Sequence, residues 1–251
     1  FVLDPSFRIM YYATLGVFSP EPRMSLKMNF TPKIRFKGAA GMYSQTLMSA
    51  SSDRDVVNLF YGFINAPESD QLSSSYLDKD LKSHKTNSSV QKAQHYVAGF
   101  EFDLLKYFEL NVEVYQKNVK QIVNVNRDKL FDDTPENANK PDASKKDFVI
   151  EEGRARGFDV VLKFEYKRLY FWGVYSLTKN DRWNGDVVTK TTFNYPPNFD
   201  RRHNVNLVGS YTFGKKRNFE INVRWNYGSP FPTTPTQGYY PQLNFNNNLN
   251  Y

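Results

Sequence analysis

The residue types that most often carry chemistry are sparse in this sequence. Its three histidines, His84, His95 and His203, are far apart, and none has metal-ligand spacing with another histidine. There is no cysteine, so a thiolate metal site and a disulfide framework are both excluded. Serine is abundant, but the G-x-S-x-G pattern of a nucleophilic serine does not occur. We therefore expect no enzyme, no metal site and no cofactor. His95 could touch a ligand, although a solvated position on a polar strand face is the simpler interpretation.

Two further motifs also favour structural interpretations. Asp132, Asp133 and Glu136 form an acidic patch without the ligand spacing of a calcium loop, so we interpret them as solvated loop residues. The run from Gly153 to Gly157 precedes a strand pattern, whereas a phosphate-binding loop precedes a helix. Small residues there are expected to allow a strand bend or the close approach of another segment.

The elements that must position these residues are β-strands. Between residues 199 and 231, two stretches alternate between apolar and polar side chains on either side of the charged, glycine-led turn 214–218. Successive side chains of a strand point to opposite faces, so this pattern predicts a β-hairpin. Each arm has about ten residues, the length with which a tilted strand crosses a bilayer, whereas soluble strands have roughly 5–6. Aromatic residues near the arm ends would suit membrane interfaces: Phe199, Phe213, Phe219, Trp225 and Tyr227.

The same alternation recurs along the whole chain. It predicts about nine strands, over residues 7–13, 24–30, 34–42, 95–104, 108–125, 158–166, 169–178, 204–213 and 219–227. In residues 169–178 both faces are apolar, so their orientation is left open. Polar segments without alternation are expected to be loops, over residues 16–22, 47–91, 126–147, 179–198 and beyond 229, with a short helix near Val56–Phe60.

The connections between these strands alternate in length. The short turns are Thr31-Pro32, Leu105–Tyr107, Lys167-Arg168 and Gly214–Asn218. After each short turn comes one strand and then a long loop, so short and long connections alternate along the chain. An antiparallel meander would gather the short turns at one end and the long loops at the other. Outer-membrane barrels have this asymmetry, with short periplasmic turns and long extracellular loops. The expected fold class is therefore all-β, an antiparallel transmembrane β-barrel segment.

The two faces of the predicted strands differ in a way that fits such a barrel. The apolar face would meet lipid, and the polar face would line a wet lumen. The lumen-facing candidates are Arg35, Glu101, Glu113, Lys163, Glu165, Asn222 and Arg224. Such bulky and charged side chains do not suit the small packed core of a soluble barrel. On the opposite face, Ile221 is expected to meet lipid near the midplane of the membrane.

Composition and strand number restrict the interpretation further. The net charge is +7, but the basic residues are spread over turns and alternate strand positions, so we expect no nucleic-acid partner. No run approaches the roughly 18 apolar residues of a membrane-spanning helix. Single-chain bacterial barrels have an even number of strands, and an open edge cannot face lipid. About nine strands are not expected to close alone, so we interpret the sequence as part of a longer chain.

Several stretches resemble the C-terminal half of TonB-dependent outer-membrane receptors. They cover most of the chain in the family's order, and they are SPEPRMSLKMNFTP, IRFKGAAGMYSQ, KAQHYVAGFEFDLLKYFELNVEVYQKNV, EEGRARGFDVVLKFEY, YSLTKNDRW, and FDRRHNVNLVGSYTFGKK with WNYGSPFPT. The resemblance implies that residues 1–251 are a partial barrel domain of about 22 strands in all, whose plug domain is not in this chain. It also implies active uptake of a scarce ligand such as a siderophore, oligosaccharide or peptide, energised by TonB through the missing N-terminal segment.

The resemblance carries expectations about location and partners as well. It implies the bacterial outer membrane, with contacts to lipid and lipopolysaccharide, an unknown transported ligand and room for a surface lipoprotein partner. Arg201 and Arg202 could bind lipopolysaccharide phosphates at the extracellular end, or they could be surface charges where a strand begins. Three alternatives stay open: a passive porin-like barrel, a receptor-like subunit of a surface complex, and a soluble β-rich binding domain.

Overall fold

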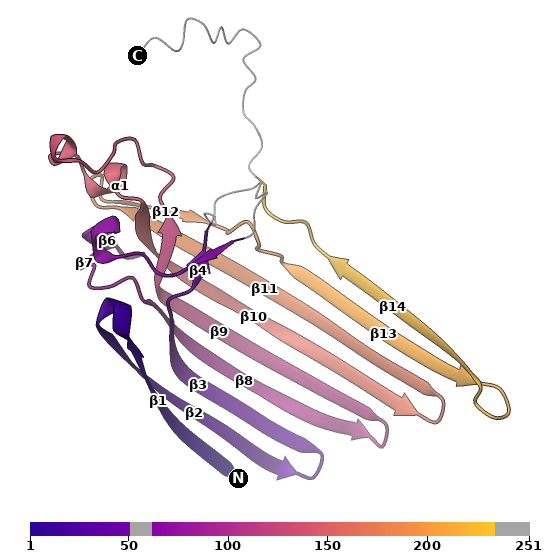
Figure 1. Cartoon of the computed structure of the whole chain (residues 1–251). Helices are drawn as coiled ribbons and strands as arrows, with labels where there is room; N and C mark the ends of the chain where they lie inside the picture. Colours follow the sequence, from indigo (N-terminus) through magenta and orange to yellow (C-terminus); the bar gives the residue numbers. More distant parts are fainter. Residues whose placement is uncertain (51–61, 234–251) are drawn as a thin grey trace, which may run out of the picture.

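The chain folds into one large antiparallel sheet, which a computed structural model describes over residues 1–50 and 62–233 (Figure 1). Its principal strands follow one another in chain order: β1 (Val2–Tyr12), β2 (Val17–Thr31), β3 (Ile34–Gln45), β8 (Gln91–Leu105), β9 (Phe108–Val125), β10 (Phe148–Tyr166), β11 (Leu169–Asp186), β13 (His203–Phe213) and β14 (Phe219–Gly228). A further strand, β12 (Thr191–Tyr195), pairs with the end of β11. The expectation of an all-β, antiparallel fold is confirmed. Within the described ranges the sheet is open, with β1 and β14 at its two edges.

The remaining elements are short and belong to the connections. They are η1 (Ala13–Leu15), β4 (Met48–Ser49), β5 (Phe63–Ile64), η2 (Ser69–Gln71), β6 (Ser75–Leu77), β7 (Ser83–Lys85), η3 (Pro135–Asn137) and α1 (Asp142–Lys145). The helix expected near residues 56–60 lies outside the described residues, as does the chain beyond residue 233. In the part that the structure describes, no helix has the length and apolar character needed to span a membrane.

The register brings the apolar side chains of all these strands onto one face. Residues directly opposite in paired strands share a face of the sheet. One row of opposed residues crosses from β2 to β14 and is apolar or aromatic throughout: Met28, Phe36, Phe100, Val112, Val160, Tyr175, Val205 and Tyr227. We call this side the apolar face. The pairing also settles the orientation of residues 169–178: Leu169, Phe171 and Tyr175 belong to the apolar face.

The neighbouring row defines the opposite side, which we call the polar face. It runs through Asn29, Arg35, Glu101, Asn111, Val161, Val174, Asn206 and Asn226. Away from the long-loop end, no described element packs over the apolar face, and Val114 and Ile221 are 53% and 55% exposed there. The sheet therefore presents an uncovered apolar surface on one side and a charged surface on the other.

The connections segregate to the two ends of the sheet, as Figure 1 shows. The turns between β2 and β3, β8 and β9, β10 and β11, and β13 and β14 lie at one end, which we call the short-turn end. Residues 46–50, 62–90, 126–147 and 187–202 lie at the other, the long-loop end. One connection departs from the expected pattern, because only residues 13–16 join β1 to β2 at the long-loop end. Gly16, with φ at 62°, closes that tight turn.

The strands are longer than predicted at the long-loop end: two expected loops, 16–22 and 179–198, are wrong in part, and the strand predicted over 158–166 begins ten residues earlier. Residues 17–22 belong to β2 despite Pro20 and Pro22. Over these residues β2 pairs with β1 alone, because β3 joins it only from Arg23. A proline in β2 is tolerated where its missing N–H would point to the unpaired side of the strand, since no ladder hydrogen bond is lost. Residues 148–157 belong to β10, and β11 continues through residues 179–186 before β12 returns along it.

Candidate ligand-binding site

Three long connections gather over the long-loop end of the sheet and bury a small hydrophobic core. Met48 from the first connection and Leu72 between η2 and β6 pack with Val123 of β9 and Ile150 of β10, all at most 4% exposed. Phe148 also packs against this cluster. Burial of apolar side chains in one place holds loops that are far apart in sequence against the strand ends.

A buried polar network ties β12 to the same strand ends. The hydroxyl of Tyr195 donates a 2.6 Å hydrogen bond to the carboxylate of Glu151, and the side-chain amide of Asn124 donates to the same carboxylate at 3.1 Å. Glu151 is only 1% exposed. A buried carboxylate needs such donors, because an unpaired one would be costly in a region of low dielectric constant. The network therefore fixes the position of β12 over β10.

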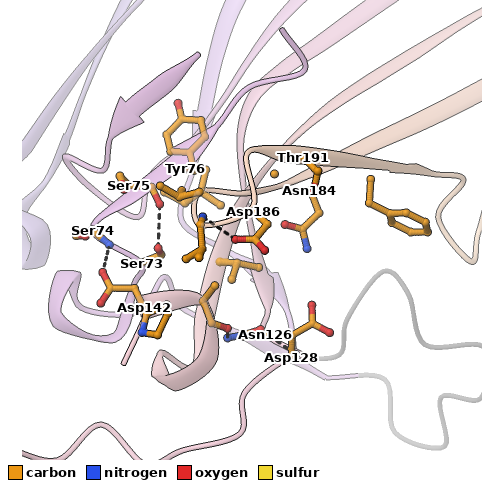
Figure 2. Close-up of a pocket in the computed structure, with 18 of the residues that line it drawn as sticks. Ser73, Ser74, Ser75, Tyr76, Asn126, Asp128, Asp142, Asn184, Asp186 and Thr191 are labelled. Atoms are coloured by element: carbon orange, nitrogen blue, oxygen red, sulfur yellow. Dashed lines mark hydrogen bonds between the residues drawn. The ribbon is translucent and has the colours of Figure 1, made fainter. Parts of the chain in front are cut away.

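Between these loops lies a cavity of about 620 Å³, which we call the loop cavity (Figure 2). Its walls come from five places: Ser73–Tyr76 around β6, Asn126 and Asp128 after β9, Lys140–Ala143 at the start of α1, Val149 and Ile150 of β10, and the hairpin of β11 and β12. The hairpin contributes polar side chains and one ring: Asn184, Asp186, Thr191 and Phe193. The volume lies within the range of about 300–1,000 Å³ typical of small-molecule pockets.

Hydrogen bonds between the connections hold the walls of the loop cavity. The carboxylate of Asp142 accepts from the backbone N–H of Ser74 at 2.9 Å, so it joins the second long connection to the first. Burial opposes ionisation of Asp142, but the Ser74 hydrogen bonds and nearby lysines outweigh it, and the pKa of Asp142 lies below its ordinary value. The side-chain amide of Asn126 donates to the carbonyl groups of Ala143 and Lys146, each at 2.8 Å.

The hairpin turns at the rim are held in the same way. Asp186 accepts from the backbone N–H of Val188 at 2.8 Å, which closes the turn between β11 and β12. In the β6–β7 turn, Asp78 accepts from His84 at 2.8 Å and from the backbone of Lys82 at 2.9 Å. Burial alone would raise the pKa of Asp78, but the hydrogen bonds from these donors outweigh burial, so the pKa lies below its ordinary value.

The residues that line the loop cavity are of types that suit ligand binding. The lining combines residues with hydroxyl, amide and carboxylate groups and the aromatic residues Tyr76 and Phe193, a combination that can hydrogen-bond a polar ligand and contact its apolar surface. Within the described ranges, no group of three or more metal-ligating side chains is close enough to hold a metal ion.

The seven lumen-facing candidates share the polar face, but they do not form this cavity. Arg35 donates to Glu101 at 3.0 Å and to Asp103 at 2.6 and 2.8 Å, near the short-turn end. The pairing puts the others on the same face: Glu113, Lys163, Glu165, Asn222 and Arg224. Whether this face lines a lumen stays a prediction. The structure spreads these residues along a wall and does not bring them to one site.

The other singled-out residues have local partners. Arg202 pairs with Asp200 at 3.2 Å, and the guanidinium of Arg201 lies 4.3 Å from the ring centre of Phe231. Both arginines are half-buried beside β13, at the long-loop end. The proposed role in lipopolysaccharide binding is untested, and the intramolecular contacts fit the alternative of a structural strand entry.

Three further motifs can be placed as well. His203 accepts or donates a 3.0 Å hydrogen bond with Tyr175. In the acidic patch, Asp133 pairs with Lys146 at 2.5 Å, so part of that patch is bound to its own loop. Between Glu151 and Gly153 the register of β10 with β9 shifts, an irregularity of the kind that bends a strand, as one of the two expectations for these small residues requires.

Sequence reasoning missed every residue of the loop cavity. Ser73–Ser75, Asn126, Asp142, Asn184 and Asp186 lie in segments that lack periodicity, with no spacing that marks a binding motif. The available signal was indirect, namely that three polar loops should meet at one end of an antiparallel sheet.

The fold and site therefore define an antiparallel all-β sheet with a loop-built cavity at one end. Comparisons with known protein families and with curated proteins find no match to this sequence.

Proposed function

We propose that this chain forms part of the wall of an outer-membrane β-barrel receptor, which takes up a scarce ligand in a TonB-energised manner. The observation that carries the proposal is the apolar face, which is continuous from β2 to β14 and, away from the long-loop end, uncovered by any described element. An exposed apolar surface of this extent is unfavourable in water and favourable against lipid.

Aromatic pairs at the short-turn end support the same proposal. Phe108 and Phe164 lie 4.4 Å apart between ring centres, and Phe213 and Phe219 lie 5.3 Å apart. All four belong to the apolar face, on four different strands. Membrane barrels carry girdles of aromatic residues at the level of the interfaces.

The long-loop end would then be extracellular, and the loop cavity would meet a ligand that arrives from outside. Its hydrogen-bonding groups and two rings favour a polar small molecule as that ligand. The TonB-energised step is supported by the resemblance of the sequence to TonB-dependent receptors, and it separates this proposal from a passive porin-like barrel.

Cysteine labelling tests the membrane topology directly, because the chain has no cysteine of its own. Asn139→Cys lies in the long connection before α1, and Lys216→Cys lies in the turn between β13 and β14; both side chains are exposed. A membrane-impermeant maleimide added to intact cells should label Asn139→Cys and leave Lys216→Cys unlabelled until the outer membrane is opened. Equal labelling of both in intact cells, or recovery of the protein without detergent, would contradict the proposal.

The energised step needs its own experiment. Photo-cross-linking of the full-length protein to TonB in cells should yield a joint product. Correct insertion without any cross-linked product would favour the passive barrel.

A further inference from the structure

A groove of about 480 Å³ is set into the apolar face beside the short-turn end; we call it the apolar groove. Strands β9, β10, β11, β13 and β14 contribute its walls, which include Phe108, Leu162, Phe164, Phe171, Tyr211 and Ile221. The strand register places every one of these residues on the apolar face. The groove is therefore a hollow in the surface that the proposed function sets against lipid.

A glycine opens the middle of the apolar groove. Gly209 of β13 lies directly between Phe171 of β11 and Val223 of β14. A methyl group added at Gly209 would have its nearest contact at 3.9 Å, to the backbone carbonyl oxygen of Tyr170. The surrounding side chains thus leave a space that no described side chain fills, and an apolar hollow on a protein surface suits an apolar occupant.

Two basic turns border the groove where it reaches the short-turn end. Leu169 and Tyr211 line the groove and lie directly opposite each other, just after the β10–β11 turn and just before the β13–β14 turn. The backbone N–H of Thr212 donates a 2.9 Å hydrogen bond to the carbonyl of Arg168, so the end of β13 is held beside the β10–β11 turn. Together the two turns carry Lys167, Arg168, Lys215, Lys216 and Arg217.

The described protein does not neutralise these five cations. Their side chains make no hydrogen bond or ion pair with a described residue, and all but Arg168 are exposed. Neither turn contains an acidic residue, and the acids next to them in sequence, Glu165 and Glu220, lie on the polar face. The ammonium group of Lys167 lies 4.9 Å from the ring centre of Tyr166, a residue of the apolar face. Positive charge is therefore available beside the apolar groove.

An anionic phospholipid matches both halves of this arrangement. Its acyl chains are apolar and flexible, and its phosphate is negative. Basic side chains at a membrane surface attract anionic headgroups, and long cationic side chains can keep their charge at the headgroup level while their stems lie along apolar surface. A soluble anion would leave the groove empty, and a neutral apolar molecule would leave the cations without a partner.

We propose that the apolar groove binds an acyl chain of an anionic phospholipid, whose phosphate pairs with the cations of the two neighbouring turns. The inference rests on the proposed membrane location, and it adds a specific lipid site in the leaflet at the short-turn end. It does not depend on energised transport or on the loop cavity.

Native mass spectrometry of the full chain in detergent tests both halves of the site, with phosphatidylglycerol and phosphatidylcholine of the same acyl chains as probes. Phosphatidylglycerol should bind more tightly. The combined variant Lys215→Gln, Lys216→Gln and Arg217→Gln should weaken its binding by about 10–100-fold, because each basic residue near an anionic surface contributes roughly a factor of five. The same variant should leave phosphatidylcholine binding nearly unchanged. Gly209→Leu, which fills the groove, should weaken the binding of both lipids.

Each variant has a matched control. Gly38→Leu makes the same substitution on the apolar face but outside the groove. The combined variant Lys82→Gln, Lys85→Gln and Lys190→Gln removes three exposed charges at the long-loop end. Neither control should change lipid binding appreciably. The charge variants leave the strands as they are, so they test the site even if Gly209→Leu fails to fold.

Equal affinity of the parent chain for the two lipids would overturn the proposal, and so would equal losses from the charge variants at the two ends. A dimer that forms without lipid and is lost in Gly209→Leu would also overturn it, because the groove would then be an interface between copies of the chain. The cysteine labelling above is independent. Labelling as expected without lipid selectivity would overturn only the lipid site, whereas selective lipid binding by a chain that fails the labelling test would overturn only the barrel.

Discussion

A single charge placed on the apolar face tests the membrane assignment most directly. Val160 lies in β10, directly between Val112 of β9 and Tyr175 of β11. From Tyr166, where β10 reaches its short turn, the strand runs back about six residues to Val160. At about 3.3 Å per residue and a tilt of about 45°, this is roughly 14 Å of depth, near the middle of an apolar band about 25 Å tall. Val160→Lys is therefore expected to destabilise the fold by about 2–4 kcal/mol.

The next residue provides the matched control. Val161 has the same size but lies on the polar face, opposite Asn111 and Val174, so Val161→Lys should cost less than about 1 kcal/mol. Ile221 lies close to Phe219, where β14 begins, at a depth of roughly 5 Å. In the proposed membrane Ile221 would then lie near the interface, so Ile221→Lys should cost only about 0–1 kcal/mol.

Reversible denaturant unfolding of the full chain in lipid vesicles, followed by tryptophan fluorescence, measures these differences. The expected order of destabilisation is Val160→Lys well above Ile221→Lys, with Val161→Lys close to the parent chain. If Val160→Lys and Val161→Lys cost the same, the two faces meet the same environment and the reasoning from the register fails.

Two further predictions concern packing and pH. Gly157→Ala should destabilise the sheet by about 1–3 kcal/mol, because the added methyl would lie 2.2 Å from the carbonyl oxygen of Leu177. The control Gly209→Ala, whose added methyl has a nearest contact of 3.9 Å, should have little effect. Thermal unfolding of both variants checks this, and equal midpoints would refute it. Asp78 has a lowered pKa in the fold, so its contribution to the β6–β7 turn is present above about pH 4 and is lost as the pH falls through the lowered value. Protease cleavage in this turn should therefore increase at acidic pH, and Asp78→Asn should cleave readily at neutral pH as well; an unchanged cleavage rate in that variant would contradict the assignment.

The sheet could be predicted from the sequence where its two faces meet different surroundings. Period-two alternation located β13 and β14 almost to the residue, since one side of this hairpin is apolar and the other polar. It also grouped the candidates Arg35 and Glu101 correctly, because the pairing of β3 with β8 places them directly opposite each other.

The pattern failed where both faces of a strand are covered alike. Residues 149–153 of β10 are buried on both sides by loops, so apolar and acidic residues occur there without alternation. Residues 179–186 of β11 are polar on both faces, because their partners are side chains such as Asp200, which accepts from Asn180 at 2.9 and 3.0 Å. A strand that is held by its ladder and by polar contacts leaves no hydrophobic period to detect.

The loop cavity could not be predicted, because its geometry depends on tertiary contacts alone. Ser74 and Asp142 are 68 residues apart, and nothing in either segment indicates that they share a hydrogen bond. They meet because the cluster around Leu72 and Ile150 draws both connections onto the strand ends. Long-range burial of this kind is decided by the fold as a whole, and local sequence patterns do not encode it.

The polar face itself is divided in a way that bears on function. Near the short-turn end two of its cations share acidic partners: Arg35 pairs with Glu101 and Asp103, and Lys37 pairs with Glu101. Near the long-loop end, Lys117 has no such partner among the described residues. A wall that needed charge only for solvation would gain from pairing at both ends, because opposite charges across a strand pair are stabilising and like charges are not. Arg23 pairs with Glu21 on the polar face near that same end, so the charge without a described partner belongs to Lys117 and not to the whole end of the sheet.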